Sequence, residues 1–341
     1  MASYAVEFDM RTVFDFLISL TIGDGSDRDL LPEDQRWLQA ARSGLPAQLR
    51  SELDSCFGES SKGVFHGVGS LAVALPEVRD AADFLRTIEN LSTAEIARVT
   101  IAAGVQDETL GSVIERAVEG DRAAIEELAP RLSDYSREDV LAFLRDPEPA
   151  VQRALAVMHA WLEPFGQVEE RVLAMLARDV ADRAADRATL DQATLIERTT
   201  GGMRWLPEPQ ARRVVLAPSY FARPYNHVYA GADWRLFCYP VADSALGADD
   251  GVTPPPAMVR LHRALGDPTR LRILKLLRDR DWYLTELAQQ LELSKPTIKH
   301  HLAQLRAAGL ATVTEEGTLH YYSLRRERLE EAGTDLLRYL G

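Results

Sequence analysis

The chain has 341 residues and a formal net charge of −13; 46% of its residues are hydrophobic and 27% are charged. A chain of this length accommodates about two domains, and its composition excludes collagen-like, low-complexity and wholly disordered proteins. Two cysteines are too few for a disulfide scaffold or a structural zinc site. The opening residues MASYAVEFDM lack the basic and apolar parts of a signal peptide, and no apolar run approaches the roughly 18 residues of a membrane span. We therefore expect a soluble, cytoplasmic protein.

The negative charge is concentrated in the larger, N-terminal part. Residues 256–341 contain 14 Lys and Arg against 11 Asp and Glu, a net charge of +3, whereas residues 1–255 contain 25 against 41, a net charge of −16. A nucleic acid is therefore a reasonable partner for the C-terminal part alone.

The first two hundred residues predict mainly helix. Ser92 and Glu95 have the spacing of a capping box, before a helix that we expect to end near Ala103. Asp121 precedes a further apolar-periodic segment, and Ser136 with Asp139 forms a weaker version of the same signal.

A long stretch without a further proline runs from Pro164 to Thr199, after Pro147 and Pro149 mark the start of the preceding helix. Outside one apolar stripe, this stretch is alanine-rich and charged, which favours a solvated face over a helix packed on a partner subunit. Part of the stretch is nevertheless a candidate for a second dimer contact. Apolar residues at every fourth position predict one buried stripe: Val168, Val172, Leu176 and Val180.

Segments rich in β-branched and aromatic residues predict strands near residues 4–9 and 212–241. The fold class is therefore mainly α, of the α+β type, with a helical N-terminal domain that carries a small β-sheet. Aromatic residues are dense here, and we expect most of them to form the core of that sheet, with an apolar ligand pocket as the alternative: Trp205, Tyr220, Phe221, Tyr225, Tyr229, Trp234, Phe237 and Tyr239.

No combination of residues in this domain predicts catalysis. His159 and Glu163 have a metal-binding spacing but no third ligand, so a surface pair is favoured. Cys56 and Cys238 lie in apolar contexts, which favours buried, inert thiols over a redox pair. No phosphate-binding loop, nucleophile elbow or HExxH helix occurs. We predict no catalytic residue, no metal ligand and no cofactor, leave cofactor-binding residues unassigned, and expect a protein that is not an enzyme.

Residues 251–256 end in three prolines and predict a linker between a domain at 1–250 and a domain at 257–341. The sequence of the second domain predicts helix, helix, turn, helix and then a two-stranded wing around Glu315–Gly317. This is the order of elements in a winged helix-turn-helix. Its expected elements are a helix at 258–265, a helix from Pro268 that buries Leu271, Ile273, Leu274 and Leu277, a helix opened by Thr285, a helix from Lys295 to about Ala308 capped by Ser294, and a closing helix after the wing.

The helix that begins at Lys295 has the residues of a DNA-reading helix. Its apolar stripe of Ile298, Leu302 and Leu305 must face the protein. Lysines on the other face suit phosphates, polar side chains suit base edges, and the wing suits the flanking backbone or minor groove. The predicted DNA-binding residues are Ser294, Lys295, Thr297, Lys299, His300, Gln304, Thr318, His320 and Tyr321, whereas His301 lies nearer the packed side.

Three segments together resemble the ArsR family of bacterial winged-helix repressors: ALGDPTRLRILKLL, TELAQQLELSKPTIKHHLAQLRAAGL and the wing that ends in HYYSL. The resemblance covers about a quarter of the chain. It implies a homodimer built through Met258–Leu265 and Arg326–Leu340, and a palindromic operator on double-stranded DNA.

The departures from that family are equally informative. The helix LTELAQQL lacks the cysteines of metal-sensing members, and the last helix has Glu331 and Asp335 but no histidine. The chain resembles a long subgroup whose N-terminal domain is poorly characterised. We expect a cytoplasmic, dimeric transcriptional repressor whose N-terminal domain senses a non-metal signal, with a small-molecule effector as a further partner and no membrane. The alternatives are a protein-interaction module and an enzyme-fused regulator.

Overall fold

The computed structural model describes residues 4–23, 29–58, 64–105, 108–132, 137–247, 254–316 and 319–341. Residues 4–247 are here called the body, and residues 256–341 the winged module. A four-stranded sheet lies at the centre of the body in the order β1 (Ala5–Phe8), β3 (Arg213–Ser219), β5 (Trp234–Pro240) and β4 (His227–Ala230). The first three strands are parallel and β4 is antiparallel to β5. The strands expected near residues 4–9 and 212–241 are therefore present, and the N-terminal strand joins the sheet.

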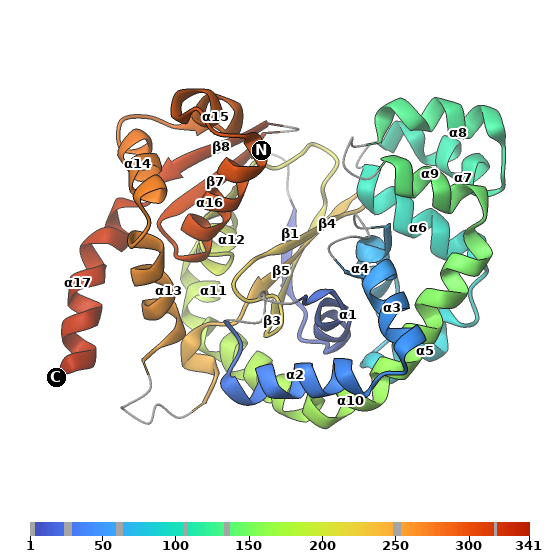
Figure 1. Ribbon diagram of the computed structural model, residues 1–341, viewed down its shortest axis with the longest axis horizontal. Helices are drawn as coiled ribbons and strands as arrows, with labels where there is room; N and C mark the ends of the chain where they lie inside the picture. Colours follow the sequence, from blue (N-terminus) through green and yellow to red (C-terminus); the bar gives the residue numbers. More distant parts are fainter. Residues whose placement is uncertain are drawn as a thin grey trace.

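Helices surround this sheet and make the protein mainly α (Figure 1). The longest, α10 (Pro147–Asp182), passes along one side of the sheet and contacts α1, α3, α5 and α6. The other helices of the body are α1 (Val13–Thr21), α2 (Pro32–Gly44), α3 (Ala47–Cys56), α4 (Gly69–Ala74), α5 (Ala81–Ile88), α6 (Thr93–Val105), α7 (Gly111–Val118), α8 (Arg122–Leu128), α9 (Arg137–Arg145), α11 (Ala184–Thr189) and α12 (Gln192–Thr199).

The helix starts follow the capping signals. Ser92 and Glu95 close the capping box at the start of α6, because each backbone N–H bonds the side chain of the other residue. Asp121 accepts bonds from the backbone of the first turn of α8. Ser136 lies outside the described residues. No helix of the described ranges is long and apolar enough to cross a membrane.

One boundary differs from the expectation. The sequence suggests a new helix from Pro164 to Thr199, but α10 continues through Pro164, and the chain breaks only near Arg183 and again before α12. Proline removes one helical hydrogen bond, yet burial of Trp161 and Phe165 on either side holds the helix in place. The predicted apolar stripe of this segment is buried.

The aromatic residues of the sheet region are mostly core, as expected. Tyr220, Phe237 and Tyr239 are fully buried, whereas Tyr225 is 37% exposed. The Tyr239 hydroxyl donates to Asp179 of α10 at 2.8 Å, which ties the helix to β5. Cys56 and Cys238 are both free and buried, and burial raises the pKa of the Cys56 thiol to about 11.

The winged module has the predicted order of elements, with one additional short strand, β6, between the second and third helices. It contains α13 (Pro256–Leu265), α14 (Pro268–Leu277), β6 (Trp282–Tyr283), α15 (Leu284–Leu291), α16 (Lys295–Ala307), β7 (Ala311–Glu316), β8 (Leu319–Leu324) and α17 (Arg326–Leu340). Pro256 is the first residue of α13, so the helix begins inside the expected 251–256 linker.

Two details of the module differ from what the sequence predicts. Leu271, expected to be buried, is 48% exposed, because Ile273, Leu274 and Leu277 alone form the packed face of α14. The helix expected to open at Thr285 begins at Leu284, since the carboxylate of Glu286 accepts the backbone N–H of Tyr283 at 3.0 Å.

The body and the winged module share one hydrophobic core. A short strand of the body, β2 (Met203–Trp205), pairs in parallel with β7 and extends the wing into a sheet of order β2-β7-β8-β6. Gly202 precedes this strand with φ of +108°, and a Cβ there would lie 2.7 Å from the Thr312 side chain. Trp205, Phe237 and Tyr239 of the body belong to the same buried cluster as Leu261 and Leu305 of the module.

Candidate nucleic-acid interface

Helix α16 is held by its apolar stripe and by a side-chain cap. Ile298, Leu302 and Leu305 are almost completely buried, as the sequence predicts, and the helix packs on α15. Ser294 accepts the Thr297 backbone N–H through Oγ at 3.3 Å. The two contacts fix which face of α16 points outward.

The first two turns of α16 are exposed and cationic. Lys295, Thr297, Lys299 and His300 are all exposed, and they follow exposed Ser294. The hydroxyl of Thr297 lies 2.7 Å from Ser294 Oγ, which positions one polar side chain at the start of the helix. Lysine ammonium groups bind phosphates, and threonine and histidine bond base edges, so this face has the chemistry of DNA recognition.

Gln304, expected to read bases, has a different environment. Its side chain is half-buried, and its amide donates to the hydroxyl of Tyr225 of the body at 3.1 Å. The sequence gives no sign of this contact, because the two residues are 79 positions apart. In this arrangement the amide is engaged by the body.

The wing supplies part of the predicted set. His320 is exposed, and Tyr321 is half-buried with its hydroxyl bonded to that of Tyr283. The ring centroids of these two tyrosines lie 4.2 Å apart, so Tyr321 packs against Tyr283. Thr318 lies outside the described residues.

His301 lies on the packed side of α16, as its sequence position suggests. Its Nδ1 is 3.8 Å from Asp267, the residue that caps α14 through the Arg270 backbone N–H. Burial lowers the pKa of His301, and the Asp267 carboxylate opposes that shift. This environment indicates a structural position between α14 and α16.

The candidate metal ligands of the body do not converge. Nε2 of His159 lies 2.6 Å from the carboxylate of Glu89. Within the described part of the chain, no group of three or more His, Cys, Asp and Glu side chains has the arrangement of a metal site.

Comparison with known proteins places the resemblance in the winged module. A family model described as "Bacterial regulatory protein, arsR family" matches residues 267–313. The HTH-type transcriptional regulator KmtR of Mycobacterium tuberculosis is 36% identical over 93 residues, which are 26% of this chain and 72% of that protein. Transcriptional repressor SdpR of Bacillus subtilis is 34% identical over 83 residues, 24% of this chain and 92% of that protein. Among solved structures, HlyU from Vibrio cholerae is 32% identical, covers 24% of this chain and 88% of its own, and has a TM-score of 0.21.

Proposed function

Because the chain belongs to the ArsR family of bacterial regulatory proteins and is a DNA-binding transcriptional regulator, we propose that it is a homodimeric repressor that binds a palindromic operator in the cytoplasm. The exposed cationic face at the start of α16 carries this proposal. A dimer presents two such faces about one DNA turn apart, which matches the symmetry of a palindrome.

Each residue of the interface has a proposed role. Lys295 and Lys299 neutralise phosphates, and the free backbone N–H groups after Ser294 bind a further phosphate. Thr297, His300 and Gln304 contact base edges in the major groove. Thr318, His320 and Tyr321 contact the flanking backbone or the minor groove.

The dimer contact uses the first and last helices of the winged module. Leu337 and Leu340 of α17 are each 70% exposed and Val259 of α13 is 36% exposed. The two helices contact each other, and exposed apolar side chains on them favour a protein contact over permanent exposure to water. A second copy of the chain buries them in the proposed dimer.

The body senses a signal other than a metal ion and does not catalyse a reaction in this proposal. Helix α15 contains no cysteine, and α17 has Glu331 and Asp335 without a histidine. The body shares a core and a sheet with the winged module, so a change in the body is transmitted directly to the module that binds DNA.

The test is binding of the full-length chain to DNA from upstream of its own gene, measured by fluorescence anisotropy across a salt series. We expect tight binding with a steep salt dependence. Lys299→Ala should weaken binding about tenfold and reduce the salt slope by about 1 per lysine removed.

Lys275→Ala is the matched control, because Lys275 is an exposed lysine on α14, outside the proposed interface. It should change the affinity less than twofold. Binding no tighter than to unrelated DNA, or equal losses in the two variants, would contradict the proposal and favour a winged helix used for protein contacts.

A further inference from the structure

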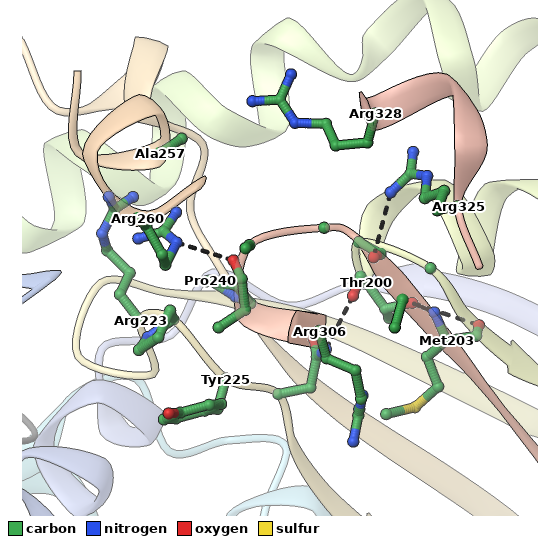
Figure 2. A pocket seen from close by; sticks show the side chains of 18 of the residues that line it. Thr200, Met203, Arg223, Tyr225, Pro240, Ala257, Arg260, Arg306, Arg325 and Arg328 are labelled. Carbon is green, nitrogen blue, oxygen red and sulfur yellow. Dashed lines mark hydrogen bonds between the residues drawn. The ribbon is translucent and has the colours of Figure 1, made fainter. Parts of the chain in front are cut away.

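A cavity of about 550 Å³ lies between the body and the winged module. Figure 2 shows arginine side chains around it that come from both parts of the chain. The body contributes Arg223 and Tyr225, α13 contributes Arg260, and α16 contributes Arg306. Arg325 immediately precedes α17, and Arg328 lies in its first turn. The volume is that of a typical small-molecule site.

Three of these arginines are bonded to carboxylates. Arg223 bonds Asp243 at 2.5 Å, and Arg260 pairs with Asp29. Arg328 lies 2.7 Å from Asp335 and 3.1 Å from Glu331. These pairs hold the walls of the cavity and largely cancel their own charge.

Arg325 differs from them. Its guanidinium donates to the neutral carbonyl of Gly201 at 3.3 Å, and within the described ranges no carboxylate pairs with it. The two carboxylates of the lining, Asp243 and Glu331, pair with other arginines. Arg325 therefore adds a positive charge that no ion pair cancels, and a bound anion would neutralise it.

The rest of the lining is partly polar, with Thr200 and Asn226 beside the paired carboxylates of Asp243 and Glu331, and partly apolar. Met203, Val241 and the small residues Ala257, Ala303 and Ala307 line the cavity, and the ring of Tyr225 is partly exposed there. An inorganic ion would leave this surface unfilled. The lining suits an organic molecule with one anionic group and an apolar body.

We propose that this cavity binds a small organic anion, a carboxylate or phosphate on an apolar body, and that binding lowers the affinity of the protein for DNA. The second half of this proposal rests on the proposed function. The cavity has walls from both parts, so a ligand stabilises the present arrangement of the body and the module. In that arrangement Tyr225 engages Gln304, and Arg260 Nε donates to the Ala307 carbonyl at the end of α16 at 2.8 Å.

The first experiment measures binding of 8-anilinonaphthalene-1-sulfonate, a fluorescent organic anion, to the full-length chain. Octanoate and octyl phosphate should displace the probe, and their relative potency tells a carboxylate ligand from a phosphate ligand. Octanol and inorganic phosphate should not displace it at the same concentrations. Arg325→Gln should weaken probe binding about tenfold, because one charge-assisted contact is lost.

Two further variants keep this test decisive. Arg325→Lys retains the positive charge and should bind the probe within about threefold of the unmodified chain. Arg326→Gln removes the neighbouring, exposed arginine and should have no effect. Equal losses in the two glutamine variants, or displacement by octanol as effective as by octanoate, would overturn the anion site.

The second experiment adds octanoate to the DNA-binding assay. We expect about a tenfold loss of DNA affinity, and saturating DNA should weaken octanoate binding by the same factor. Unchanged DNA affinity with selective octanoate binding would overturn the regulatory half and leave the proposed function standing. Selective octanoate binding by a chain that binds no DNA would overturn the proposed function and leave the anion site standing.

Discussion

At the scale of single residues, Asp15 is the most unusual group in the body. Its side chain is completely buried, and one carboxylate oxygen accepts bonds from Ser219 Oγ and the Phe221 backbone N–H while the other has no partner. Burial raises its pKa from about 3.8 to about 7, although those hydrogen bonds oppose the shift. The group therefore binds a proton more tightly in the folded chain than in the unfolded chain.

This difference makes the free energy of unfolding depend on pH. The stabilising contribution of the protonated group is fully present below about pH 4 and is lost as the pH rises through about 7. Between pH 5 and pH 8 the chain should lose about 2–3 kcal/mol relative to Asp15→Asn, which keeps an acceptor oxygen but does not titrate. Urea unfolding of both proteins at several pH values measures this difference. A difference that stays constant with pH would contradict the expectation.

The predicted DNA-reading residues show what local sequence information can achieve. Lys295 and Lys299 lie within one helix, which Ser294 caps, so the apolar periodicity of that helix alone predicts that they face outward. Arg223, Arg260 and Arg325 come from three separate segments that only the folded chain brings to one cavity. No spacing within the sequence could have grouped them.

At the scale of elements, periodic helices were predictable and short strands were not. Helix α16 and the wing follow patterns of several residues each. β2 and β6 have three and two residues, too few for an alternating pattern, and they exist because partner strands supply their hydrogen bonds. Pro164 favours a helix boundary by local rules, but packing of α10 against the body overrides that preference.

Helix α17 is the element on which the proposed dimer can be tested. Glutamate at both Leu337 and Leu340 should weaken the proposed dimer at least a hundredfold, because two apolar side chains would no longer be buried and two charges would enter the contact. Both side chains are 70% exposed, so the helix itself should stay folded. Sedimentation velocity across a concentration series measures the dissociation constant.

A control variant separates the contact from a general effect of charge. Leu206→Glu alters a leucine of the body that is 48% exposed and should leave the dimer intact. Dimerisation that survives the double substitution would show that the contact lies elsewhere. The exposed leucine of α10, Leu173, would then be the next surface to alter, since it lies in the region expected to form a second dimer contact.

At the scale of the whole molecule, the body is more than an appendage to the winged module. Its strand β2 extends the wing sheet, its aromatic residues complete the core of the module, and Arg325 of the module donates to Gly201 of the body. The two parts are therefore joined by a shared sheet and a shared core, and a contact between them can compete with DNA.

The contact between Tyr225 and Gln304 is the most direct place to test that competition. Tyr225→Phe keeps the ring but removes the hydroxyl that accepts the Gln304 amide. Freed from this bond, the amide should become available to a base edge, and the affinity for operator DNA should rise about threefold, the net worth of one hydrogen bond. Binding to unrelated DNA should not change, because phosphate contacts are untouched. The same substitution in a Gln304→Ala background should have no effect, since the competing amide is already absent. An equal rise in both backgrounds would mean that Tyr225 acts on DNA binding by a route other than this side chain.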